Sequence, residues 1–175
     1  MRCTGVAKSN PGFTLLELLV VLVILTILGS LTIPRFIASV RREQLTASSR
    51  QAINWLEDIR NQALKEMISC DISLTLDSTQ QGVLAVKDTS PGCSQQEPLL
   101  IGSGGPKPIL LTINGQEQGK IELLFSPRGT ISSNHELKLT MKGASISRCL
   151  RISSPLGLIR MGTHQSNQCD YSQAL

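Results

Sequence analysis

The sequence is poor in aromatic residues: it has three Phe, one Tyr and one Trp among 175 residues. Leu, Ile and Val must therefore supply most of the packing in a folded core. No aromatic cluster is present on which bases could stack, so sequence-specific recognition of single-stranded nucleic acid is not expected. A chain of this length forms about one domain, and a large enzyme fold does not fit.

The sequence also lacks a recognisable catalytic or metal-binding constellation. Its two histidines are His135, beside Glu136, and His164, and neither has the spacing of a metal-ligand set. The glycine-rich segment 102–105 lacks the lysine and Ser/Thr of a phosphate-binding loop, and no G-x-S-x-G nucleophile elbow occurs. We therefore expect no enzyme activity, no metal and no cofactor.

What the sequence does have is one long apolar run, residues 13–33, which ends at Pro34 and contains a single charged residue, Glu17. A helix of this length would span about 30 Å, which matches the hydrocarbon core of a membrane. The preceding segment, MRCTGVAKSNPG, carries Arg2 and Lys8 and no acid. A secretory signal is cut after its apolar run, whereas here a Pro-Gly pair stands before the run. Cleavage at that pair would leave the helix on the product.

Glu17 is the unusual residue of this run. A carboxylate among apolar side chains costs about 1 to 3 kcal/mol, depending on its depth in the membrane, and indicates a function and a partner. If the chain is cut after Gly12, Glu17 becomes the fifth residue and lies one helical turn from the new amine of Phe13. That amine, of the same chain or of a neighbouring one, is the candidate partner.

The segment Gly12-Phe13-Thr14-Leu15-Leu16-Glu17, with its basic leader of residues 1–12, resembles the class III signal of type IV pilins and type II secretion pseudopilins. The resemblance implies that a prepilin peptidase cuts between Gly12 and Phe13 and methylates the new N-terminus. It also implies that Glu17 neutralises the Phe13 amine of an adjacent subunit during assembly. Pro34 would kink or locally melt the helix. A plain signal anchor that happens to begin with these residues is the alternative.

The same resemblance implies partners and a location. The partners are the prepilin peptidase, the inner membrane and other pilin or pseudopilin subunits, which bind through the N-terminal helix. The chain would first cross the bacterial inner membrane once, and would later belong to a periplasmic or surface filament.

Residues 35–69 are predicted to continue the first helix as an amphipathic one. Apolar residues recur every three or four positions, and charged residues occupy the other faces. The apolar stripe consists of Ala52, Leu56, Ile59, Ala63 and Met67. A sheet is needed to cover this stripe, and Trp55 is expected to pack at its edge rather than to bind a ligand.

Residues 70–175 are predicted to form a β-rich head, because the periodicity changes from helical to alternating. Short antiparallel strands are expected near residues 72–76, 83–86, 121–125, 137–141, 150–152 and 158–161. The segments 126–129 and 154–157, both Ser-Pro-x-Gly, are predicted to be type I hairpin turns, and the Pro- and Gly-rich segment 89–108 a surface loop.

The predicted fold class is therefore α+β. A long N-terminal helix, with residues 13–34 as the transmembrane and assembly half and residues 35–69 as the amphipathic half, packs on an antiparallel sheet in the head.

The cysteines are scattered rather than closely paired. Cys3 lies in the leader, and the mature chain would keep four others, none with the C-x-x-C spacing of a zinc site. In a chain whose body lies outside the cytoplasm disulfides are favoured, and the nearest partners are Cys70 with Cys93 and Cys149 with Cys169. The two other pairings, and buried free thiols, stay open.

The head resembles the GspH/FimT group of minor pilins and pseudopilins, in residues 125–129 and in the C-terminal segment 148–160. In FimT-like DNA-uptake pilins the final hairpin carries a Gly-Arg-x-Arg motif that binds DNA. The matching residues here are Gly157, Leu158, Ile159 and Arg160, so a leucine replaces the first arginine. Because DNA affinity comes mainly from neutralised phosphates, this difference weakens the DNA interpretation.

The C-terminal third is nevertheless the basic end of the chain, since residues 128–175 hold six basic residues and two acidic ones. The candidate contacts to double-stranded DNA, with His164 nearby, are Arg148, Arg151, Arg160 and Lys142. Strand alternation places Arg151 on the face opposite Leu150 and Ile152, and therefore towards solvent. The competing interpretation is a solvated sheet face that keeps the head soluble.

Two functions follow from the resemblance. The first is a minor pilin or pseudopilin subunit of a type IV pilus-type filament, which contributes to DNA uptake in natural transformation. The alternative is a minor pseudopilin of a type II secretion system that binds no DNA.

Overall fold

A computed structural model describes residues 12–87, 92–93, 96–103, 105, 107–117, 119–144, 146–165 and 168–172. Residues 1–11 of the leader, with Cys3, lie outside the described residues, as do parts of the expected loop 89–108. The chain divides into two compact units, Met1–Ile37 and Ala38–Leu175. Helix α1, Leu15–Glu66, contributes residues to both of them.

In the first unit the apolar side chains of α1 are exposed. Leu18, Ile24 and Leu28 each keep more than half of their surface accessible. Pro34 lies inside α1, and the helix is continuous through it. The local melting that the resemblance allowed is therefore not seen.

In the second unit α1 buries one stripe of side chains. The fully buried ones are Leu45, Ala52, Leu56, Ile59 and Ala63. Trp55 is a packing residue, as predicted: it is 7% exposed, and its indole N–H donates to the carbonyl oxygen of Glu97 at 2.9 Å. The prediction that Met67 continues the stripe is wrong, because α1 ends at Glu66 and Met67 is 80% exposed with a φ of 53°.

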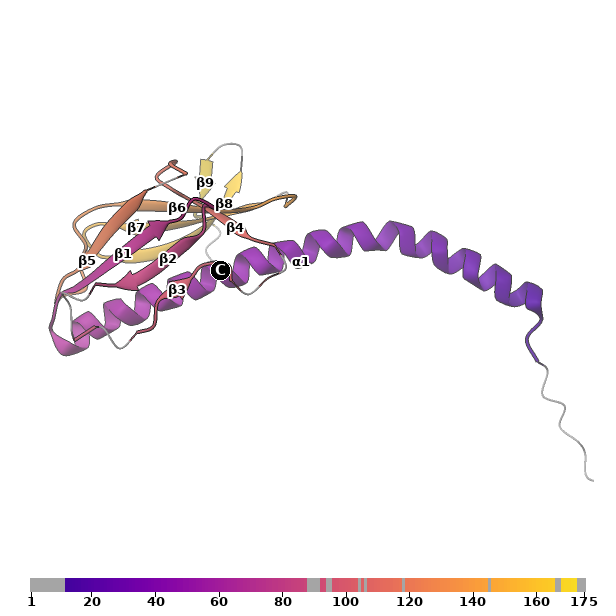
Figure 1. The fold of residues 1–175 in the computed structure, drawn as a ribbon, viewed down its shortest axis with the longest axis horizontal. Coiled ribbons are helices and arrows are strands. Elements are labelled where there is room, and N and C mark those ends of the chain that lie inside the picture. Colours follow the sequence, from indigo (N-terminus) through magenta and orange to yellow (C-terminus); the bar gives the residue numbers. More distant parts are fainter. Residues whose placement is uncertain are drawn as a thin grey trace, which may run out of the picture. The chain divides into compact units, whose positions relative to one another are not determined.

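The head contains antiparallel strands, as predicted, but they form two sheets rather than one (Figure 1). The first sheet has the order β3-β2-β1-β5, and its strands are β1 Cys70–Leu76, β2 Gly82–Val86, β3 Leu99–Leu100 and β5 Lys120–Phe125. The second sheet has the order β4-β6-β7-β8-β9, and its strands are β4 Ile109–Ile113, β6 His135–Met141, β7 Ser147–Ser153, β8 Leu158–Gln165 and β9 Gln168–Asp170.

Three of these strands were not predicted from the sequence. β3 lies within the segment expected to be a loop, and that expectation is wrong for its two residues. β4 follows directly on the Pro- and Gly-rich segment, and β9 is short and polar. Such strands are specified by pairing with a neighbour more than by their own pattern.

One hydrophobic core unites the two sheets with the second half of α1. Alternate residues of each strand point inwards, as the period of a strand requires. The fully buried strand residues include Ile72, Leu74, Leu84, Leu111, Phe125, Leu137, Leu139, Leu150 and Ile152. Every residue of this core lies in the second unit, so the head has a core of its own.

The two Ser-Pro-x-Gly segments differ in what they connect. The segment 126–129 forms a turn, with the Gly129 N–H donating to the Ser126 carbonyl oxygen at 2.8 Å. It is not a hairpin, because β5 pairs with β1 in the first sheet whereas β6 pairs with β4 and β7 in the second. The segment 154–157 does join the paired strands β7 and β8, as predicted.

The β7–β8 loop is nevertheless not the simple type I turn that was expected. The Ser154–Pro155 peptide bond is cis, and the loop closes through the Gly157 N–H, which donates to the Ser153 carbonyl oxygen at 2.9 Å. Arg60 of α1 ties the two segments together, since Nε donates to the Gly129 carbonyl at 3.0 Å and Nη2 to the Leu156 carbonyl at 3.1 Å.

Two disulfides join Cys70 to Cys93 and Cys149 to Cys169, which is the pairing favoured from the sequence. The first fastens the start of β1 to the segment that follows β2. The second fastens β9, the last strand of the second sheet, to β7.

Candidate functional site

The N-terminal candidate residues lie at the start of α1. The Thr14 hydroxyl caps the helix by accepting a hydrogen bond from the Glu17 backbone N–H at 3.2 Å. Thr14 and Glu17 thus have the spacing of a capping box, and the Glu17 carboxylate lies in the first turn, where the helix dipole favours a negative charge. The sequence analysis missed this role of Thr14, although the Thr-x-x-Glu pattern before an apolar run indicates it.

Gly12 has no structural reason to be glycine. A Cβ atom at this position would meet no atom within 4 Å, and the φ of Gly12 is not in the left-handed region. Phe13, which follows it, is 83% exposed. The fold of the chain therefore accommodates a side chain at Gly12.

The first half of α1 is suited to an apolar solvent. The helix is long and apolar enough to cross a membrane, with a mean hydropathy of 2.6 in its most apolar window. Two of its hydroxyl groups bond within the helix, since Thr26 Oγ1 donates to the Val23 carbonyl and Ser30 Oγ to the Ile27 carbonyl, both at 2.8 Å. Such internal bonds lower the cost of a hydroxyl in a membrane.

The four candidate DNA-binding residues do not form one exposed basic patch. The inclusion of Arg148 in it is wrong, because strand alternation puts this residue on the same face as Leu150 and Ile152 and leaves it 8% exposed. Its guanidinium donates to the Thr46 hydroxyl of α1 at 3.0 Å and to the Thr163 hydroxyl of β8 at 2.7 Å. Arg148 thus connects the second sheet to the helix.

The environment of Arg148 also disfavours its charged form. Burial, and then the nearby charges of Arg42 and Arg50, lower the pKa of its guanidinium from the usual value. No local pattern in the sequence indicates the contact with Thr46, which lies 102 residues away along the chain.

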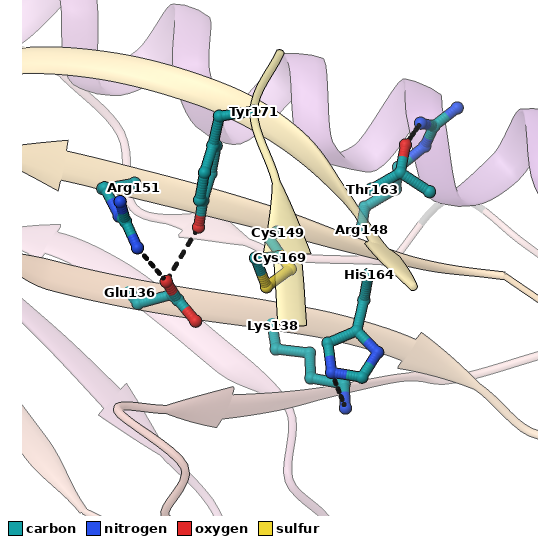
Figure 2. The surroundings of a disulfide bond; sticks show 9 residues. All are labelled: Glu136, Lys138, Arg148, Cys149, Arg151, Thr163, His164, Cys169 and Tyr171. Carbon is teal, nitrogen blue, oxygen red and sulfur yellow. Dashed lines mark hydrogen bonds and ion pairs between the residues drawn. A yellow bond between two sulfur atoms is a disulfide. The ribbon is translucent and has the colours of Figure 1, made fainter. Parts of the chain in front are cut away.

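Arg151 points to the outer face of the second sheet, the face away from the core, as alternation predicts, but other side chains engage it. Its Nη2 lies 3.0 Å from Glu136 Oε2 on β6, and its guanidinium lies 4.4 Å from the centre of the Tyr171 ring. The Tyr171 hydroxyl donates to the same Glu136 oxygen at 2.9 Å (Figure 2). The charge of Arg151 is therefore largely compensated within the head.

Close packing against Gly162 keeps Tyr171 in place beside Glu136 and Arg151. Tyr171 and the Asp170 carbonyl lie against Gly162, where a Cβ atom would collide with both. Burial, followed by the bond to Glu136, raises the pKa of the Tyr171 phenol well above its usual range. The phenol thus remains a neutral donor to Glu136 at physiological pH.

Arg160 and Lys142 are exposed, and within the described residues neither makes an ion pair. Arg160 lies directly opposite Arg151 in the sheet, whereas Lys142 follows β6 at the end where Ser147 pairs with His164. Lys142 therefore lies at the His164 end of β8, and His164 is four residues from Arg160 along that strand. The Lys142 and Arg160 side chains are thus on the order of 13 Å or more apart. Among the described residues, only these two of the four candidates are both exposed and outside an ion pair.

Gly157, the first residue of the segment matching the DNA-binding motif, has a role in the fold. Its φ is +62°, and a Cβ atom there would collide with the Gly129 carbonyl oxygen. Leu158 is exposed on the same face of β8 as Arg160. Leu158 thus takes the place of the motif's first arginine at a solvent-exposed position.

His164 lies beside a lysine rather than beside the candidate arginines. Its Nε2 is 3.1 Å from the Nζ of Lys138 on β6, next to the Cys149–Cys169 disulfide (Figure 2). The second histidine, His135, has its pKa lowered by burial, and its Nδ1 is buried without a hydrogen-bond partner. Among the described residues, no three His, Cys, Asp or Glu side chains are arranged to hold a metal ion.

Comparisons with known proteins give results for both parts of the chain. Residues 7–33 match the prokaryotic N-terminal methylation motif. The fold is similar to that of the type IV minor pilin FimU of Pseudomonas aeruginosa in a P21 crystal, with 15% identity, a TM-score of 0.50, and coverage of 77% of this chain and 96% of that one. A P65 crystal of the same protein gives 16% identity, a TM-score of 0.48, and coverage of 74% and 98%. No curated protein sequence matches the chain significantly.

The motif and the fold support the same classification. The methylation motif contains the expected cleavage position and Glu17, and the α+β head has the fold of a minor pilin. The chain is thus pilin-like at its N-terminus and in its head.

Proposed function

From this pilin-like N-terminus and fold, we propose that the chain is a minor subunit of a type IV pilus-type filament. A prepilin peptidase cuts it after Gly12 and methylates the amine of Phe13. The first half of α1 holds the processed subunit in the bacterial inner membrane as a single pass. The same helix later packs against other subunits in a filament in the periplasm or at the cell surface.

The observation that carries this proposal is the exposed apolar half of α1 together with the methylation motif of residues 7–33. So many exposed apolar side chains are unfavourable in water and require an apolar environment. Lipid provides that solvent before assembly, and the helices of neighbouring subunits provide it afterwards.

Glu17 has a defined place in this scheme. Its carboxylate would cost free energy in a bilayer, and pairing with a cation would recover part of it. The new amine at Phe13 is such a cation, and it lies at the end of α1 where Glu17 stands. An incoming subunit would therefore be aligned by the fit of one subunit's amine to another's carboxylate.

Cleavage is tested by replacing Gly12 with valine. The fold accommodates this side chain, so any loss of processing must come from the peptidase. We expect the precursor mass to persist when the variant is expressed with a prepilin peptidase. Gly29→Val is the matched control, because a Cβ atom at Gly29 also meets no atom within 4 Å, and it should be cut normally. Normal cutting of the Gly12 variant would remove the proposed processing.

DNA capture by the head is the second function to be tested, and the geometry does not favour it. Arg148 is buried, and Arg151 is paired with Glu136. We expect residues 38–175 to show no more than weak binding to a short duplex in a fluorescence-anisotropy salt series. Tight binding with a log-log salt slope of about −2 to −4, lost in the Arg151→Ala, Arg160→Ala double variant, would instead support DNA uptake.

The absence of such binding would favour the purely structural role, in a pilus or in a type II secretion pseudopilus. Both machines use the same signal and helix. They are distinguished by which one loses function when the gene for this chain is deleted: twitching and surface pili in one case, export of secreted proteins in the other.

A further inference from the structure

A cavity of about 450 Å³ opens on the outer face of the second sheet. Strands β4, β6, β7, β8 and β9 all contribute to its lining, with Thr112, Glu136, Lys138, Arg151, His164 and Cys169 among the lining residues. Its size falls within the range of about 300 to 1,000 Å³ that small-molecule sites have. The pilin-like function described above makes no use of it.

The register of the sheet brings these side chains together. Lys138 lies between Thr112 on β4 and Cys149 on β7, and Glu136 lies opposite Arg151. All of them point to the outer face, because they alternate with buried residues such as Leu137 and Leu139 on β6. The cavity is thus built on a rigid part of the fold.

Cys169 lines the cavity, and its disulfide with Cys149 fixes the strand that pairs with His164. Cys169 pairs with His164 across β8 and β9, while its sulfur is bonded to β7. The C-terminal strand therefore cannot swing away without breaking this bond. As a result the imidazole of His164 is held over Lys138 (Figure 2).

The cavity has more hydrogen-bond donors than acceptors. Lys138 Nζ carries three donor hydrogens, and its one observed partner is His164 Nε2 at 3.1 Å. Among the described residues, no carboxylate lies within ion-pair distance of Lys138. The one acid in the lining, Glu136, already accepts from Arg151 and Tyr171 through the same oxygen.

A partly buried ammonium without an acidic partner is costly, and an anion removes that cost. Lys138 Nζ donates to His164 Nε2 at 3.1 Å, and because the two nitrogens are adjacent, one phosphate or carboxylate group placed beside them can accept from both. In that arrangement the histidine donates rather than accepts. Apolar ligands fit poorly, because charged and polar side chains dominate the lining.

We propose that this cavity is a binding site for a small ligand carrying an oxyanion, a phosphate or a carboxylate group, which Lys138 and His164 grip together. Arg151 lines the same cavity, but Glu136 largely compensates its charge, so Lys138 is the cation available to the ligand. The site lies on the head and is independent of the N-terminal helix. It would therefore remain whether or not the chain assembles into a filament.

The test uses the full chain in nonionic detergent, in a buffer free of phosphate and carboxylate, and isothermal titration calorimetry with sodium phosphate or sodium acetate. We expect a dissociation constant of about 1 mM for at least one of the two anions, as a small exposed site allows. Lys138→Ala should weaken binding by about tenfold or more, whereas Lys138→Arg should keep most of it. The matched control is Lys142→Ala, which removes an exposed lysine outside the cavity and should change nothing.

Three outcomes would overturn the proposal. The first is no binding of either anion by the wild-type chain up to about 50 mM, well above the expected dissociation constant. The second is an equal loss of binding in the Lys138 and Lys142 variants, which would indicate general charge attraction. The third is binding of a short DNA duplex through Lys138 with no binding of phosphate or acetate. His164→Gln, which removes the ring and keeps a polar side chain, should also weaken binding, and circular dichroism confirms that each variant is folded.

Discussion

The two units of this chain use the same aliphatic side chains in opposite ways. In the first unit, Leu, Ile and Val along α1 are exposed, whereas in the second unit the same residue types are buried between two sheets and the rest of α1. Burial of these side chains stabilises the head by itself. The first unit gains the equivalent stabilisation only from another molecule, either lipid or the helix of a neighbour.

Because of this difference, we expect substitutions in the two units to affect different properties of the protein. Substitutions in the first unit should alter processing and assembly while the head keeps its stability. Substitutions in the head should alter stability while processing remains normal. The predictions below test this separation, in order of the expected effect.

The largest effect should come from Glu17→Val. We expect the variant to be cut normally and to be lost from filaments, because the carboxylate that aligns the Phe13 amine of the neighbour is gone. Incorporation is measured by the amount of the subunit in sheared filaments relative to the membrane fraction. The unfolding midpoint of the head should stay unchanged. Wild-type levels in filaments would contradict the charge pairing.

Next is the loss of the Cys70–Cys93 disulfide. The bond closes a loop between residues 23 positions apart and has two fully buried cysteines, so Cys70→Ser with Cys93→Ser should lower the free energy of unfolding of the head by about 3 kcal/mol. Urea denaturation of residues 38–175 measures the change. Processing after Gly12 should be unaffected, and a processing defect would show that the two units are not separable.

A smaller effect on the free energy of unfolding should distinguish Arg148 from Arg160, which were grouped together as candidate DNA contacts from the sequence. Arg148→Ala removes hydrogen bonds between the sheet and α1 and should cost about 2 kcal/mol, whereas Arg160→Ala on the exposed face should cost less than about 0.5 kcal/mol. The same denaturation experiment compares them. Equal values would mean that Arg148 does not connect the sheet to the helix in solution.

The smallest effect should be the pH dependence that His135 introduces. Burial lowers the pKa of His135 in the folded head, so the unfolded chain binds the proton more readily. Stability should therefore fall slightly as the pH drops below about 6.5, the usual pKa of histidine, and level off below the folded pKa. His135→Gln should reduce this fall between pH 7 and pH 5. A fall of the same size in the variant would assign the pH dependence to other groups.

Much of the head could be anticipated from alternation. The buried stripe of α1 and the six predicted strands follow directly from periods of 3.6 and 2, because each of these patterns concerns residues that are close together in the sequence. β3 and β9 have two and three residues, too few for a period to be recognised. The turn at 126–129 was predicted correctly as a turn, but no local pattern showed that the strands on either side belong to different sheets.

The candidate sites divide in the same way. Gly12, Phe13 and Glu17 lie close together in the sequence, within the methylation motif of residues 7–33, so the motif can be recognised from the linear segment. The basic residues of the head have no such local meaning. Arg148 donates to a residue 102 positions away, and Arg151 shares Glu136 with Tyr171, which lies 35 positions from Glu136.

The sequence by itself determined the membrane-compatible helix, the methylation motif and the α+β class, since each depends on composition, motif or period over a short stretch. Only the tertiary structure decided which charges are available. It buried Arg148 against α1, paired Arg151 with Glu136, and placed Lys138 beside His164, with no acid of the described residues within ion-pair distance. The physical reason is that burial and ion pairing are set by the neighbours in space, and in a sheet of five strands those neighbours come from distant parts of the chain.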